Sequence, residues 1–137
     1  MKNLGISIYP QKASLERNIA YLEDASRFGF KRLFVALLGA EPTQDGIRRD
    51  YGPILKRAKE LGFEISCDVN GEVIKAVCGE GYFGNYDLSF FKEMGVDIIR
   101  FDMGMSEMEE AFFIRNPFDI KIELNMSMEI DHVSGVL

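Results

Sequence analysis

The sequence predicts an α/β fold, a partial (β/α)8 TIM barrel of about five parallel strands with intervening helices. Three observations support this prediction. Gly29, Gly62 and Gly95 lie 33 residues apart (62 − 29 and 95 − 62), each between an amphipathic stretch and an apolar run. Strand and helix patterns that alternate at this length indicate a parallel sheet with right-handed crossovers. The apolar runs also have one aliphatic face and one polar face.

The faces of the strands distinguish a barrel from an open, doubly wound sheet of the flavodoxin type, which the chain length would also fit. Residues 120–125 read Ile-Lys-Ile-Glu-Leu-Asn, so aliphatic and polar side chains point to opposite sides. A doubly wound sheet has helices on both faces and should read as nearly continuous Val, Ile and Leu. The alternation therefore favours a barrel with a polar interior. Strands are expected at about residues 3–9, 32–38, 63–69, 97–102 and 119–125.

Capping residues and apolar spacing predict the first two helices. Ser14 is a favourable N-cap for the first helix. The apolar residues that follow on one face are Leu15, Ile19, Leu22 and Ala25. Pro53 suits the first turn of the second helix, because its missing N–H group is not needed there. The apolar residues along that helix are Ile54, Ala58 and Leu61.

Three further helical stretches complete the alternation. Residues near 71–79 are expected to form a short helix or turn. Asp87 can cap the next helix, with Leu88 and Phe91 facing inward. Ser106 and Glu109 match a capping box for a last helix, which should end at Asn116-Pro117.

Length, charge and cysteine content narrow the classes of protein. The chain has 137 residues, enough for one domain at most, and a net charge of −6. An acidic chain without a lysine-rich stripe is a poor candidate for binding nucleic acid or an anionic membrane. No apolar run approaches the roughly 18 residues of a membrane span, and no signal peptide is visible. Cys67 and Cys78 lack metal-ligand spacing and are expected to be buried or free thiols.

Carboxylates lie where three neighbouring strands are predicted to end, and barrel enzymes place their active sites there. Because adjacent strands are about 4.8 Å apart, Asp68, Asp102 and Glu123 should converge within roughly 10 Å. Carboxylates this close can supply an acid beside a base, as glycoside hydrolysis requires. We therefore expect these three residues to be catalytic. Glu64 and Lys121 lie deeper in the strands and are interpreted as structural.

Other polar residues near the strand ends are expected to bind substrate. They are Ser7, Tyr9, Asn70, Arg100, Asn125 and Ser127. Arg100 could keep one carboxylate ionised or bind an anionic group of the substrate. No cofactor or metal site is expected, and His132, the only histidine, is assigned no role.

Two other functions stay open at this stage. The same three carboxylates could be oxygen ligands of a divalent metal in a sugar-phosphate isomerase or epimerase, although such sites usually add histidines. A non-enzymatic half-barrel module is the second alternative. Open sheet edges would favour self-association in that case.

Four stretches resemble the N-terminal TIM barrel of MupG-type 6-phospho-N-acetylmuramidases. They are residues 4–10, 87–95, 100–102 and 122–127, and the resemblance runs in order from about residue 2 to 127. It implies a cytoplasmic glycosidase without a known cofactor, which cleaves 6-phosphorylated MurNAc-GlcNAc during peptidoglycan recycling. The residues that match strand-end positions of the family are Asp68, Asp102, Glu123 and Asn125.

The resemblance also sets an expectation for domain organisation. Residues 1–127 are expected to be the N-terminal part of a TIM-barrel glycosidase domain, followed by a divergent tail at residues 128–137. Full members of the family close the barrel, so this chain is expected to be a truncated form. Activity is expected to require the missing strands, which in many barrels supply a phosphate site.

Overall fold

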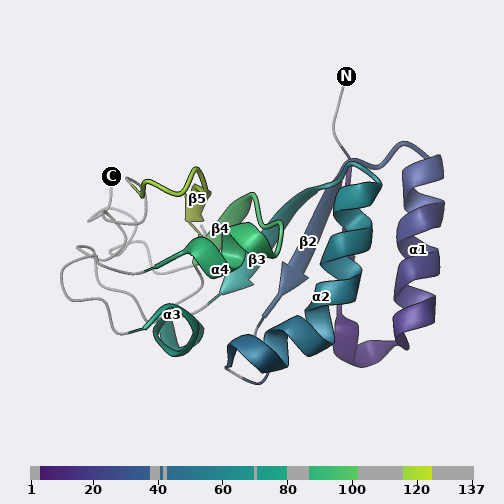
Figure 1. The fold of residues 1–137 in the computed structure, drawn as a ribbon. Helices are drawn as coiled ribbons and strands as arrows, with labels where there is room; N and C mark the ends of the chain where they lie inside the picture. The colour runs from purple at the N-terminus through teal and green to yellow at the C-terminus, as the bar shows by residue number, and fades with distance from the viewer. Residues whose placement is uncertain are drawn as a thin grey trace.

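Five parallel strands form one sheet in the computed structural model, which describes residues 4–37, 41, 43–69, 71–79, 87–101 and 116–124. The strands are β1 (Gly5–Ile8), β2 (Arg32–Ala36), β3 (Glu64–Val69), β4 (Ile98–Phe101) and β5 (Lys121–Leu124). The helices are η1 (Pro10–Lys12), α1 (Leu15–Arg27), α2 (Gln44–Glu60), α3 (Gly71–Cys78) and α4 (Ser89–Glu93). In Figure 1, α2 lies in front of β2 and β3, and α1 packs beside it.

The order of the strands identifies the sheet as part of a barrel. The order is β1-β2-β3-β4-β5, so each strand pairs in parallel with its neighbour in sequence. In a doubly wound sheet the spatial order of successive strands reverses at a switch point, as in the order 2-1-3-4-5. No reversal occurs among the described strands, and each one lies within its predicted range. The prediction of a partial (β/α)8 barrel is confirmed.

The repeated glycines end three helices in the same way. Gly29, Gly62 and Gly95 have φ values of 89°, 86° and 87°, in the left-handed region that glycine enters without a steric penalty. Each glycine N–H donates to the carbonyl three residues earlier, and the next N–H donates to the carbonyl five residues earlier. These paired bonds are the Schellman motif. The spacing seen in the sequence is therefore a structural repeat of helix, stop and strand.

The core lies between the aliphatic face of the sheet and the helices. The register aligns Val35, Cys67 and Ile99 across three strands, and all three are buried. Tyr51 of α2 is also buried, and its hydroxyl donates to the carbonyl of Ala36 over 2.9 Å. Burial of this apolar face contributes most of the stabilisation, at roughly 25 cal/mol per Å² of apolar surface removed from water.

The buried side of α1 differs in part from the prediction. Ser14 caps the helix as predicted, accepting from Arg17 N over 3.2 Å. Leu22 and Ala25 are buried, but Leu15 is 43% exposed and Ile19 is only partly buried. Asn18 takes their place, with 6% exposure. The contact with the sheet and α2 follows residues 18, 22 and 25, so the predicted apolar face is buried only at Leu22 and Ala25.

The predicted start of the second helix was also wrong. α2 begins at Gln44, where Thr43 accepts from Gly46 N over 3.0 Å, and Pro53 lies inside the helix. A proline in a helix interior removes one hydrogen bond and clashes with the preceding turn. Figure 1 shows α2 changing direction partway along, as expected for a proline kink. Burial of Ile47 and Tyr51 ahead of the proline favours the longer helix.

The later elements follow the prediction where they are described. α3 spans residues 71–78. The N-cap of α4 is Leu88, and Asp87, one residue before it, accepts from Ser89 N over 2.9 Å. Leu88 and Phe91 are buried as expected. The helix predicted after Ser106 and the tail at residues 128–137 lie outside the described residues. Among the helices that are described, none is long and apolar enough to cross a membrane.

Both cysteines are free thiols, as predicted. Cys67 is buried beneath the helices, and desolvation raises its pKa, with the charges of Asp68 and Asp97 adding to the shift. Cys78 is partly buried, and burial raises its pKa to about 12. Neither thiol has the lowered pKa of a nucleophilic cysteine.

Candidate functional site

One row across the inner face of the sheet carries three of the predicted site residues. The register pairs Asp68 with Arg100 and Arg100 with Glu123, on the adjacent strands β3, β4 and β5. Arg100 Nε lies 3.6 Å from Asp68 Oδ1 and 3.5 Å from Glu123 Oε2. The structure therefore brings Asp68, Arg100 and Glu123 together toward the carboxyl ends of their strands. We call these three residues the rim cluster.

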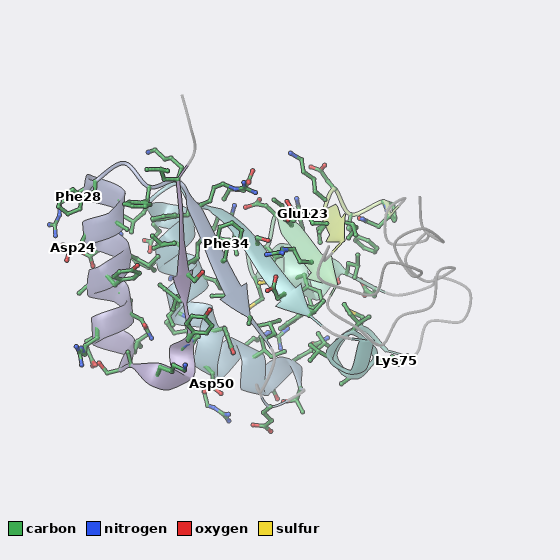
Figure 2. All side chains as sticks on the ribbon, turned by 180° about the vertical axis from the view of Figure 1, so that it is seen from behind. Asp24, Phe28, Phe34, Asp50, Lys75 and Glu123 are labelled. Carbon is green, nitrogen blue, oxygen red and sulfur yellow. The ribbon has the colours of Figure 1, made fainter. Side chains whose placement is uncertain are left out.

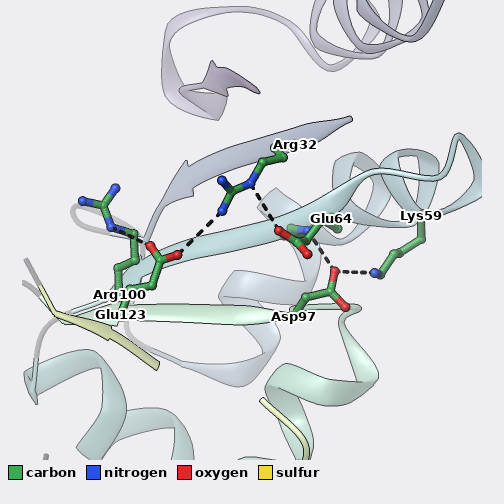
Figure 3. A network of polar contacts seen from close by, with 7 residues as sticks. Arg32, Lys59, Glu64, Asp97, Arg100 and Glu123 are labelled. Atoms are coloured by element: carbon green, nitrogen blue, oxygen red, sulfur yellow. Dashed lines mark hydrogen bonds and ion pairs between the residues drawn. The ribbon is translucent and has the colours of Figure 1, made fainter. Parts of the chain in front are cut away.

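Arg32, which the sequence analysis did not single out, joins the rim cluster from deeper in the sheet. Its Nη2 lies 3.6 Å from Glu123 Oε1, and its Nε lies 3.2 Å from Glu64 Oε1. Figure 3 shows the resulting chain of contacts from Glu64 through Arg32 and Glu123 to Arg100. Glu64, interpreted from sequence as structural, forms an ion pair at the lower end of this chain.

The contact between Arg32 and Glu123 indicates that the inner face is concave. Arg32 is on β2 and Glu123 is on β5, with β3 and β4 between them. Three strand spacings of about 4.8 Å separate these strands by roughly 14 Å along the sheet. The two side chains nevertheless approach to 3.6 Å, because both project into the interior of a curved sheet. Figure 2 shows Phe34 and Glu123 on this face, with α2 behind the strands.

The side chains of these ion pairs remain partly accessible to solvent. Exposed fractions run from 31% for Arg32 to 43% for Glu64. Ion pairs at this level of exposure typically contribute only about 0–1 kcal/mol each to stability. In Figure 3 the terminal nitrogens of Arg100 point away from Glu123, so they can reach an incoming group. The cluster is therefore better suited to binding or chemistry than to stabilising the fold.

A less polar row lies below the rim cluster. It is formed by Ser7, Phe34, Ser66, Ile98 and Lys121. Phe34 lies with its ring centroid 5.4 Å from the Arg32 guanidinium carbon, a cation–π arrangement. A Cβ at Gly5 would come within 2.4 Å of the Phe34 ring, so glycine on β1 leaves room for it. Ser66 is 2% exposed, and its hydroxyl has no hydrogen-bond partner among the described residues.

The remaining predicted site residues fall into two groups. Ser7 and Tyr9 lie at the β1 edge, where Tyr9 is 53% exposed and packs near Lys12 Nζ, 5.3 Å from the ring centroid. Within the described part of the chain, neither residue has an ion pair or hydrogen bond to the rim cluster. The predicted residues outside the described ranges are Asp102, Asn70, Asn125 and Ser127, and their roles stay predictions.

A metal site was an alternative use of the predicted carboxylates. Within the described ranges, no group of three or more His, Cys, Asp or Glu side chains is placed to hold a metal ion. In the rim cluster a guanidinium stands between Asp68 and Glu123. That arrangement suits an anionic or hydroxyl-bearing ligand better than a cation. Asp102, the third predicted ligand, lies outside the described ranges.

A model of a known protein family matches nearly the whole chain. The family described as "6-phospho-N-acetylmuramidase, N-terminal" matches residues 4–137. Curated proteins gave no match. The family match agrees with the resemblance inferred from the four sequence stretches.

Solved structures similar to this chain are much longer. A crystal structure of an uncharacterized B. cereus protein is 33% identical, with a TM-score of 0.70, and the match covers 98% of this chain and 34% of that one. A conserved Enterococcus faecalis protein of unknown function is 23% identical, with a TM-score of 0.69 and coverages of 98% and 35%. This chain therefore spans about a third of the length of these two proteins.

A third structure extends the fold comparison. It is a putative alpha-N-acetylgalactosaminidase from Bacillus halodurans, 9% identical, with a TM-score of 0.56. The match covers 90% of this chain and 48% of that protein. At this identity the similarity supports the barrel fold alone.

Proposed function

Since this chain belongs to the 6-phospho-N-acetylmuramidase N-terminal family and is a glycoside hydrolase-like domain, we propose that it takes part in cleaving a phosphorylated amino-sugar disaccharide. The proposed substrate is 6-phospho-N-acetylmuramyl-N-acetylglucosamine, and the proposed setting is cytoplasmic recycling of cell-wall sugars. The observation that carries the proposal is the rim cluster, where Asp68 and Glu123 meet around one guanidinium nitrogen.

The spacing of the two carboxylates supports a hydrolytic pair. Both contacting oxygens lie close to Arg100 Nε, so they are no more than 7.1 Å apart, the sum of the two distances. Glycosidases place their two carboxyl groups about 5–9.5 Å apart, with the shorter separation for retention and the longer for inversion. The bound of 7.1 Å is compatible with either outcome.

Each residue of the rim cluster has a proposed task. One carboxylate protonates the leaving-group oxygen, while the other attacks the sugar or activates a water molecule. The substrate carries a phosphate monoester and, on muramic acid, a carboxylate. Arg100 has terminal nitrogens directed away from Glu123 (Figure 3) and is proposed to bind one of these anionic groups. Asp102 and Asn125 are proposed to add to the site from the ends of β4 and β5.

The test is hydrolysis of the disaccharide with and without its 6-phosphate. The chain is assayed alone and together with a polypeptide corresponding to the remaining two thirds of the B. cereus relative. Cleavage of the phosphorylated disaccharide, its loss in Glu123→Gln, and little cleavage of the unphosphorylated one would support the proposal. If neither the chain nor the reconstituted, folded complex releases N-acetylglucosamine, the proposed function is wrong.

A further inference from the structure

Arg32 is a cation on the inner face that the sequence analysis did not assign, and it contacts a proposed catalytic group. Within the proposed function, on which this step rests, we propose that Arg32 is a positioning residue that fixes the Glu123 carboxylate in its working orientation. The contact is between Arg32 Nη2 and Glu123 Oε1 at 3.6 Å. The other oxygen of the same carboxylate lies 3.5 Å from Arg100 Nε. Each oxygen of Glu123 therefore faces a different guanidinium.

Arg32 is itself held in place by two neighbours. Its Nε lies 3.2 Å from Glu64 Oε1, and its guanidinium carbon lies 5.4 Å from the Phe34 ring centroid. Gly5 on the neighbouring strand leaves the space that the Phe34 ring occupies. An arginine fork whose orientation is already fixed loses less side-chain entropy when it makes a further contact. Arg32 is thus prepared to orient Glu123 before a substrate arrives.

The position of Arg32 in the sheet separates this role from substrate binding. Arg32 is paired in register with Glu64 at the start of β3, whereas Ala36 is paired with Asp68 of the rim cluster. Four residues separate these two rows, about 13 Å along the strand. A substrate that enters at the carboxyl ends of the strands meets Arg100 and Glu123 first. Arg32 approaches Glu123 from the opposite side, so it acts on the reaction through Glu123.

The kinetic test compares Arg32→Met and Arg32→Lys with a matched control, Arg27→Met. Arg27 pairs with Asp24 on the exposed face of α1, away from the strands. In the assay system of the proposed function, Arg32→Met should lower kcat by about 10- to 100-fold with KM nearly unchanged, because misplacement of a reacting group acts on the chemical step. Arg32→Lys should recover part of the loss, and Arg27→Met should have no effect. An unchanged kcat in Arg32→Met would overturn the inference.

A second measurement does not depend on turnover. In the full chain labelled with ¹³C at glutamate carboxyl carbons, the Glu123 signal is assigned by its loss in Glu123→Gln. At fixed pH this signal should move in Arg32→Met and stay in place in Arg27→Met. If Arg32→Met does not fold, the same comparison is made with Arg32→Lys. If the Glu123 signal has the same position in Arg32→Met as in the wild type, the inference is overturned even when the wild type is active. A Glu123 signal that moves in Arg32→Met, together with no hydrolysis by the folded, reconstituted complex, supports the contact while contradicting the proposed function.

Discussion

The two faces of β3 carry different kinds of side chain, apolar toward the helices and mostly polar toward the interior. Toward the helices, Ile65, Cys67 and Val69 are completely buried, and their identity follows from packing against α2. Toward the interior, Glu64 and Asp68 stay partly accessible and pair with arginines of neighbouring strands. Burial fixes the first face, whereas the second retains polar groups that contribute little to stability. Polar groups gathered on a concave face are typical of ligand-binding sites.

The largest difference in activity is expected within the interior face itself, between Asp68 of the rim cluster and Glu64, which lies deeper on the same strand. Asp68→Asn should lower hydrolysis of the phosphorylated disaccharide by roughly 10²–10⁴-fold, because it removes a candidate acid or base. Glu64→Gln, the same loss of charge on the same strand, should cost less than about 10-fold. Initial rates of both variants in the reconstituted system give the comparison. Equal losses of activity in the two variants would contradict a special role for the rim cluster over the deeper Glu64.

The next largest effect is on stability and compares adjacent residues of β3 that face opposite ways. Ile65→Ala should lower the free energy of unfolding by about 2–5 kcal/mol, because it leaves a cavity in the packed face. Ser66→Ala should change it by less than about 1 kcal/mol or raise it, since the buried hydroxyl has no partner among the described residues. Urea unfolding measures both. A comparable loss in the two variants would contradict the asymmetry.

A smaller effect is expected at the turn that joins α2 to β3 and thereby sets which face each β3 residue occupies. Gly62 has φ +86°, and a side chain in this conformation costs about 1–2 kcal/mol. Gly62→Ala should therefore lower the free energy of unfolding by that amount. Gly62→Asn should cost less, because asparagine tolerates the left-handed region. Thermal unfolding of both variants measures the difference. If Gly62→Asn is no more stable than Gly62→Ala, the left-handed backbone at residue 62 is not the cause of the loss.

The smallest effect is expected when the native chain is treated with a thiol reagent, because Cys67 and Cys78 should react slowly. Burial raises the pKa of Cys67, which faces the helices, and raises that of Cys78 to about 12. Both therefore stay protonated at pH 8, and a disulfide reagent should label the native chain slowly. In concentrated urea both should react quickly, because the unfolded thiols have a pKa near 8.5. Fast labelling of native Cys67 would show that the helix-facing side opens readily.

The sequence predicted most of the fold because its signals are local. Alternation located the five strands, and the glycines located three Schellman turns. The errors arose where tertiary packing outweighed local preference. Pro53 favours a helix start by itself, yet buried Ile47 and Tyr51 extend α2 through it. Leu15 belongs to the predicted apolar face of α1, but the packed stripe of the helix runs through Asn18 instead.

The candidate site was predicted less completely, for a physical reason. Asp68, Arg100 and Glu123 lie near strand ends, so position alone pointed to them. Arg32 is the first residue of β2, and a search limited to strand ends passes over it. The available signal was its alternation with Phe34 and Ala36, which places it on the inner face. Its long side chain then crosses the curved interior to Glu123, and that reach depends on curvature that sequence does not specify.

The most direct test of this account is a crystal structure of the chain with 6-phospho-N-acetylmuramic acid, the product of the proposed reaction. The expected result has the sugar against Asp68 and Glu123, with an anionic group on the terminal nitrogens of Arg100. Asp68 and Glu123 directed to separate surfaces, or a sugar bound away from Arg100, would contradict the claim that the interior face is the active site.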